Sequence, residues 1–221
     1  MRLKMMGLCV VAVFAITAVA ASAASAATTL TLKTAKGALT SGSEVKFSSS
    51  NLVTVTSAGN LECSSNILTG TAGTNGTTKD TASITEEQST GTGEKTPGAC
   101  HTTTALGEAL ITSTGFSWPV AIGSNGKVTI KGTKKVTFTS TFPQAGGAKC
   151  TFESAKVAAT FTAKKPAKGK SETGPFTLAT SNQLFKLNKK ISNAACPVSG
   201  KLTGTFAPTS GGETIEAEFK S

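Results

Sequence analysis

Apolar and polar residues alternate with a period of two along most of this chain. In the stretch 135–142, Val136, Phe138 and Phe142 fall on one side and threonines on the other. Successive side chains of a strand point to opposite faces, so this pattern predicts a half-buried β-strand. The other segments of this kind in the second half place these residues on the inner face: Val128 and Ile130, Cys150 and Phe152, Val157 and Phe161, Phe176 and Leu178, Leu202 and Phe206, and Ile215, Ala217 and Phe219.

The first half of the chain repeats this pattern in shorter segments. Asn125-Gly126 predicts a hairpin that joins the two halves. Polar segments rich in Gly and Thr predict loops over 71–82, 88–98 and 164–175. The predicted inner residues of the first half are Leu30 and Leu32, Val45 and Phe47, Val53 and Val55, Leu61, Cys63 and Ile67, and Phe116 and Trp118 with a continuation through Val120 and Ile122.

Strand signals recur every 8–15 residues, and Gly, Pro or Asn separates them. No long stretch has the apolar spacing of an amphipathic helix. We therefore expect an all-β fold, an antiparallel β-sandwich or barrel-like sandwich. No Pro-rich linker divides the chain near residue 120, which favours a single β-domain over 27–221. The alternative is two tandem small sandwiches, about 28–120 and 121–221.

The first residues have the layout of a secretory signal peptide. Arg2 and Lys4 precede an apolar run over 5–20, and small residues follow it. We expect cleavage after Ala26, which gives a signal peptide over 1–26. The run is slightly short for an uncleaved anchor, which needs about 20 apolar residues. The expected location is secreted, extracellular or associated with the cell envelope, without a transmembrane anchor after cleavage.

Four cysteines remain after this cleavage, and an even number in an exported chain predicts a disulfide framework. Three pairings are possible. We favour Cys63–Cys100 with Cys150–Cys196, because both pairings join nearest neighbours and their flanking sequences match in pairs. That match also suggests a diverged internal duplication with one bridge in each copy. Each bridge would close a loop of about 40 residues and contribute about 4 kcal/mol to stability.

The residue types that most enzyme sites use are scarce. The chain has no Tyr, its one Arg lies in the predicted leader, and His101 and Asp80 are the single His and Asp. His101 follows Cys100 directly, so on a strand the two side chains would diverge rather than form a catalytic pair. We predict that the protein is not an enzyme and that it has no cofactor and no metal site. Glu86 and Glu87 predict a charged strand edge, and Trp118 a core residue rather than a carbohydrate platform.

Positive charge is concentrated in the second half, where residues 121–221 contain 15 Lys against 5 Glu. The clusters predict a surface for anionic envelope polymers, and the alternative is a solvated surface. Nucleic acid is not an expected partner, because Arg and Tyr are missing. Asn75-Gly76-Thr77 matches the N-glycosylation pattern. The candidate anion-binding residues are Lys131, Lys134, Lys135, Lys164, Lys165, Lys168, Lys170, Lys186, Lys189 and Lys190.

The leader and the cysteine pattern "LECSS…GAC…AKCTF…AACPVSG" resemble a loose group of small exported β-proteins of actinobacteria. The resemblance implies an exported β-fold with two cysteine pairs and no particular activity. The leading expectation is a non-enzymatic exported protein with a structural or envelope-associated role. The alternative is a lysine-rich binding module for anionic cell-envelope polymers, and a hydrolase with an unrecognised site is the least favoured. The sequence leaves the oligomeric state open.

Overall fold

The computed structural model describes residues 29–92, 94–163, 171–193 and 195–220. The predicted all-β fold is confirmed, and a single 3₁₀ turn, η1 (Pro143–Ala145), is the one helical element of these ranges. Residues 1–26, where the sequence predicts a signal peptide, lie outside them. The strands are β1 (Thr29–Thr34), β2 (Gly37–Ala38), β3 (Glu44–Ser49), β4 (Leu52–Thr56), β5 (Gly59–Cys63), β6 (Ser65–Ala72), β7 (Lys79–Thr90), β8 (His101–Thr102), β9 (Leu110–Thr114), β10 (Trp118–Gly123), β11 (Lys127–Phe142), β12 (Ala148–Thr162), β13 (Glu172–Pro175), β14 (Thr177–Leu187), β15 (Ser199–Ser210), β16 (Glu213–Thr214) and β17 (Glu216–Lys220).

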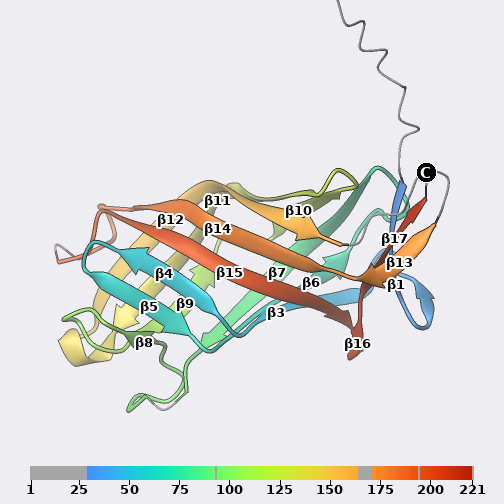
Figure 1. Ribbon diagram of the computed structural model, residues 1–221. Helices are drawn as coiled ribbons and strands as arrows, with labels where there is room; N and C mark the ends of the chain where they lie inside the picture. Colours follow the sequence, from blue (N-terminus) through green and yellow to red (C-terminus); the bar gives the residue numbers. More distant parts are fainter. Residues whose placement is uncertain (1–28, 93, 164–170, 194, 221) are drawn as a thin grey trace, which may run out of the picture.

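Eight of these strands close into an antiparallel barrel (Figure 1). Their order is β14-β12-β11-β10-β7-β6-β3-β15, and β15 pairs back with β14 to complete the ring. Closure leaves each of the eight strands with a hydrogen-bonded neighbour on both sides, and the apolar side chains that point inward form the core.

Two long strands change partners along their length and extend the barrel at one end. In β11, residues 128–130 pair with β10, whereas residues 137–141 pair with β9. In β15, residues 207–209 pair with β3, whereas residues 200–203 pair with β4. From β4 the sheet continues through β5 to β8.

A second sheet, in the order β13-β17-β1-β2, lies at the other end (right in Figure 1). Its inner residues Leu30 and Phe219 are fully buried. The ring of Phe219 packs edge-on against Phe161 of β12, with the ring centroids 5.8 Å apart, and Phe161 contacts Phe176 at 4.6 Å. This sheet therefore shares one hydrophobic core with the barrel.

The predicted inner faces are confirmed for most strands and wrong for two. In β4, Thr54 is buried and Val55 is 47% exposed. Thr54 lies opposite Leu202 of β15. The pairing with β15 therefore determines which side chains of β4 point inward. In β6, Asn66 rather than Ile67 points inward, because its side chain bonds to Ser89 of β7.

The loop predicted over 71–82 is shorter than expected. Strand β6 continues to Ala72, and β7 begins at Lys79, so only 73–78 connects them. The amide of Asn75 organises this connection: its Nδ2 donates to the carbonyls of Leu32 and Leu39 at 2.8 and 2.9 Å, and its Oδ1 accepts from the N–H of Leu32 at 2.8 Å. Both Nδ2 hydrogens therefore form hydrogen bonds within the fold. Asn75 fixes the connection to β1, and in the folded protein its Nδ2 is not free to carry a glycan.

The hairpin predicted at Asn125-Gly126 is confirmed. It joins β10 to β11, and the N–H of Gly126 donates to the carbonyl of Gly123 at 3.0 Å. Gly126 has φ +84°, in the left-handed region that glycine adopts without steric cost.

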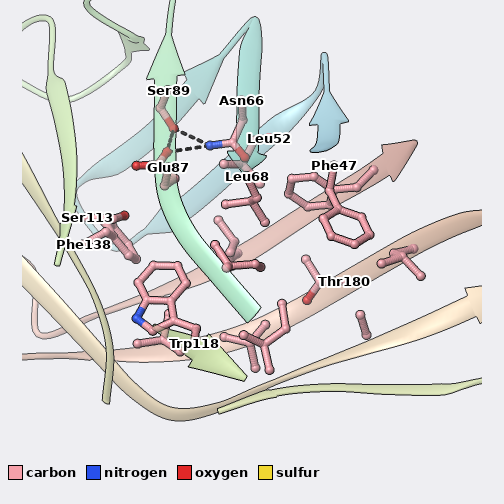
Figure 2. Close-up of a pocket in the computed structure, with 18 of the residues that line it drawn as sticks. Phe47, Leu52, Asn66, Leu68, Glu87, Ser89, Ser113, Trp118, Phe138 and Thr180 are labelled. Carbon is pink, nitrogen blue, oxygen red and sulfur yellow. Dashed lines mark hydrogen bonds between the residues drawn. The ribbon is translucent and has the colours of Figure 1, made fainter. Parts of the chain in front are cut away.

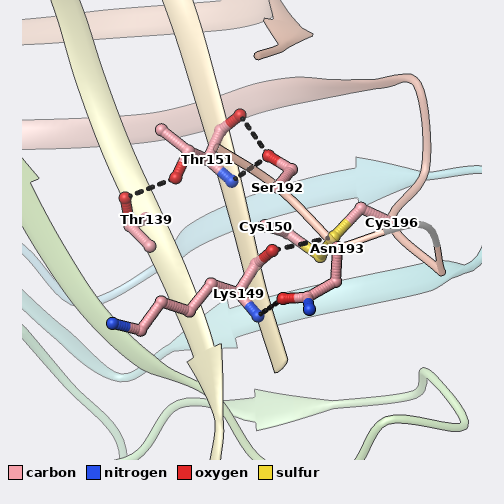
Figure 3. The surroundings of a disulfide bond; sticks show 7 residues. All are labelled: Thr139, Lys149, Cys150, Thr151, Ser192, Asn193 and Cys196. Atoms are coloured by element: carbon pink, nitrogen blue, oxygen red, sulfur yellow. Dashed lines mark hydrogen bonds between the residues drawn. A yellow bond between two sulfur atoms is a disulfide. The ribbon is translucent and has the colours of Figure 1, made fainter. Parts of the chain in front are cut away.

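Both predicted disulfides are present, Cys63–Cys100 and Cys150–Cys196. The second fastens the segment after β14 to β12 (Figure 3), where the N–H and carbonyl of Lys149 both bond to Asn193. Two disulfides are typical of proteins in oxidising, extracellular-type environments. Within the ranges that the structure describes, no helix has the length and apolar character needed to cross a membrane.

Candidate functional site

The thiol–imidazole pair does not converge in the structure. Cys100 is fully buried in its disulfide, whereas the ring of His101 is exposed on β8. The Nδ1 of His101 lies within hydrogen-bond distance of Oε1 of Glu94, at 2.9 Å, on the surface of the protein. Among the described residues, no group of three or more His, Cys, Asp or Glu side chains could hold a metal ion.

The tryptophan is a core residue, as predicted. Trp118 is 4% exposed, and its ring lies against Phe116 with the centroids 4.5 Å apart. A carbohydrate platform needs an exposed aromatic face, and this indole does not offer one.

The candidate lysines do not form one cluster. Lys135 is neutralised by Glu153, with 2.5 Å between Nζ and Oε2, and this contact lowers the pKa of the Glu153 carboxyl. Lys186 lies opposite the same glutamate on β14, and Lys189 and Lys190 are exposed in the turn that follows. The predicted anion-binding residues Lys164, Lys165, Lys168 and Lys170 lie outside the described residues, as does the side chain of Lys134.

Lys131 belongs to a different surface, a groove of about 540 Å³ on the outside of β7, β10, β11 and β12. Lys79 and Lys156 also line it, and the sequence analysis selected neither of them. The alternation in 156–163 places Lys156 on an outer face, but nothing local indicates which strand lies beside it. Lys79 falls in the loop predicted over 71–82, so the sequence pattern does not indicate its outward position on β7.

The strand register brings two of these lysines together. Lys131 of β11 lies directly opposite Lys156 of β12. Like charges in facing positions of an antiparallel pair are destabilising. Neither lysine forms a salt bridge with a side chain that the structure describes. The pair therefore presents positive charge at one end of the groove that no described carboxylate neutralises.

Small and hydroxylated residues form the floor of the groove. Ala121 lies opposite Thr81 on one side and Thr129 on the other, and Ser83 lies opposite Pro119 in the next row. Lys79 lies opposite Gly123, four residues from Ser83 along β7. At about 3.4 Å per residue, Lys79 and the Lys131–Lys156 pair are separated by about 14 Å along the strands. The groove is thus a short track with positive charge at both ends.

Comparisons with protein-family models, with curated proteins and with solved structures find no match to this chain.

Proposed function

We propose that this protein is a non-catalytic, exported binding module that holds an anionic polymer of the cell envelope in the groove over β7, β10, β11 and β12. The observation that carries the proposal is the pairing of Lys131 with Lys156 at the end of a groove that Lys79 also lines. An anionic group bound between the two ammonium groups would attract both of them and so offset their mutual repulsion.

A polymer fits this groove better than a single small anion. The positive charges lie at both ends of the track, about 14 Å apart, so one compact anion cannot contact all three lysines. The hydroxyl groups of Thr81, Ser83 and Thr129 lie between them and can hydrogen-bond to oxygen atoms of a chain that crosses the floor. A chain with phosphate or carboxylate groups at regular intervals would meet both ends at once.

Localisation supports this choice of partner. The leader predicted over 1–26 would export the chain, and the two disulfides suit an oxidising compartment. Anionic polymers of the envelope would then be within reach of the mature protein. The role is one of attachment to the envelope rather than of catalysis.

Salt-dependent retention on a polyphosphate resin tests the proposal. We compare the oxidised protein with Lys79→Gln/Lys131→Gln/Lys156→Gln and with Lys186→Gln/Lys189→Gln/Lys190→Gln, which removes the same charge outside the groove. The loss of three exposed ion pairs is worth about 2 kcal/mol at low salt, so the groove variant should bind about thirtyfold more weakly. It should elute at lower salt than the control variant.

Equal shifts in the two triple variants would show that retention follows net charge alone, and the groove proposal would then fail. A second column that carries single-stranded DNA tests whether the groove prefers nucleic acid to an envelope polymer. Tighter retention there, lost in the same groove variant, would reassign the groove to nucleic acid.

A further inference from the structure

The barrel encloses a cavity that the proposed function does not use. Its volume is about 100 Å³, and apolar side chains form most of its wall (Figure 2). Phe47, Leu68 and Phe138 line it, and the ring of Trp118 lies at one side. An engineered apolar cavity of about 150 Å³ binds benzene, so this smaller cavity suits an organic molecule smaller than benzene.

A polar cluster interrupts the apolar wall at one place. Oε1 of Glu87 accepts hydrogen bonds from Nδ2 of Asn66, at 2.7 Å, and from the hydroxyl of Ser89. Figure 2 shows the three side chains converging from β6 and β7. Burial raises the pKa of the Glu87 carboxyl, and the polar side chains of Ser89, Ser113 and Asn66 beside it oppose the rise.

Two oxygen atoms of this cluster have no partner. Oε2 of Glu87 and Oδ1 of Asn66 are buried and accept no hydrogen bond from any described residue. Asn66 is only 2% exposed, so bulk water does not reach its amide freely. Buried acceptors without donors are rare in native proteins, because each forfeits its bonds to water. When Glu87 is ionised both atoms are acceptors, so a group that completes the cluster must then donate.

An irregularity in the sheet aims Glu87 at the cavity. Gly70 of β6 lies opposite Ile84, but the adjacent Thr69 lies opposite Glu86, so Thr85 is an extra residue on β7. This β-bulge leaves Thr85 and Glu86 both exposed and turns Glu87 inward. The charged edge predicted for the two glutamates is therefore right for Glu86 and wrong for Glu87. Bulges that redirect a side chain are frequent next to functional sites.

We propose that the barrel interior binds a small primary amine, whose ammonium group donates to Oε2 of Glu87 and Oδ1 of Asn66 while its alkyl body fills the apolar cavity. The ammonium carries up to three donors and a charge opposite to that of the carboxylate. A carboxylic acid would bring like charge to Glu87, and an alcohol would supply one donor and no charge. The volume suits a body of about four carbon atoms.

The fluorescence of Trp118 provides the assay, because this residue is the one tryptophan of the chain and lines the cavity. We titrate n-butylamine, 1-butanol and butyrate into the wild-type protein, Glu87→Gln and the control Glu86→Gln. Butylamine should give a saturable change in the wild type. Glu87→Gln should raise its Kd at least about tenfold, whereas the exposed Glu86→Gln should leave the Kd unchanged.

The pH dependence in the wild type is an independent readout that needs no variant. Glu87 is the one ionisable side chain among the described residues that line the cavity, and the polar groups that face it from β6 and β9, Asn66 and Ser113, are neutral. Butylamine should bind more tightly as the pH rises and Glu87 ionises, and 1-butanol should not. A Kd for butylamine weaker than about 10 mM, equal binding of butyrate, or an unchanged Kd in Glu87→Gln would each overturn the proposal.

Discussion

Replacement of Asp80 by Asn should remove a large part of the pH dependence of stability. Asp80 lies on the inner side of β7 and is fully buried. Its Oδ1 accepts hydrogen bonds from the N–H and the hydroxyl of Thr77, at 3.1 and 3.3 Å, but its Oδ2 has no partner among the described residues. Burial dominates over these bonds and raises the pKa of Asp80 from 3.8 to about 6.

The direction of the effect follows from where the proton is bound. Between about pH 3.8 and pH 6 the folded protein retains a proton that the unfolded chain releases, so stability falls as the pH rises through this interval. At about 1.36 kcal/mol per pH unit, the loss amounts to about 3 kcal/mol. Asn cannot ionise, so the variant should gain about this amount relative to the wild type between pH 3.5 and pH 7.5.

Urea unfolding followed by the emission of Trp118 measures the free energy of unfolding at each pH. Glu86→Gln serves as the control, because it removes one carboxylate from the exposed side of the same strand. At each pH the free energy of unfolding of the wild type is subtracted from that of the variant, so that the contributions of other carboxyl groups cancel. If this difference stays constant from pH 3.5 to pH 7.5, Asp80 has no raised pKa and the reasoning is refuted.

Three further predictions concern the covalent and steric framework. Protein lacking residues 1–26 should show essentially no free thiol by Ellman titration when denatured without reductant, and any free thiol would contradict the pairing in the structure. Cys150→Ser/Cys196→Ser opens a loop with a sequence separation of 46 and should lower the free energy of unfolding by about 4 kcal/mol; a loss below about 1 kcal/mol would count against it. Gly70→Ala should cost about 1–3 kcal/mol, because its Cβ would lie 2.1 Å from the carbonyl oxygen of Ser83, whereas Gly174→Ala, whose Cβ meets nothing within 4 Å, should cost much less. Equal denaturation midpoints for the two glycine variants would contradict this steric argument.

The sequence predicted the buried faces well because burial on a strand repeats every two residues. It failed where a neighbouring strand or a bulge resets that repeat. Thr54 points inward because of its partner in β15, and Glu87 because of the extra residue Thr85. The first cause lies in another strand, and the second appears only in the pairing of β7 with β6.

The candidate site shows the same limit. The sequence indicates Lys131 through its cluster, but the facing partner Lys156 belongs to another strand. The β11–β12 register that pairs them is shifted by an irregularity between Lys131 and Val136, and the connection over 143–147 does not set it. The disulfides were easier to predict, because nearest-neighbour pairing and matched flanks left one favoured arrangement. Spacing along a chain thus identifies which residues point outward, whereas register determines which of them meet.

The pairing of β1 with β17 constrains the order in which the molecule can assemble. The hydroxyl of Thr29 donates to the carbonyl of Lys220, 191 positions along the chain, and Leu30 lies opposite Phe219. Contacts between such distant segments form late in folding, because the entropy of closing a long loop must be overcome first. The growing polypeptide cannot complete this sheet until residue 220 has been synthesised. Until then Leu30 and Leu32 of β1 have no pairing with β17.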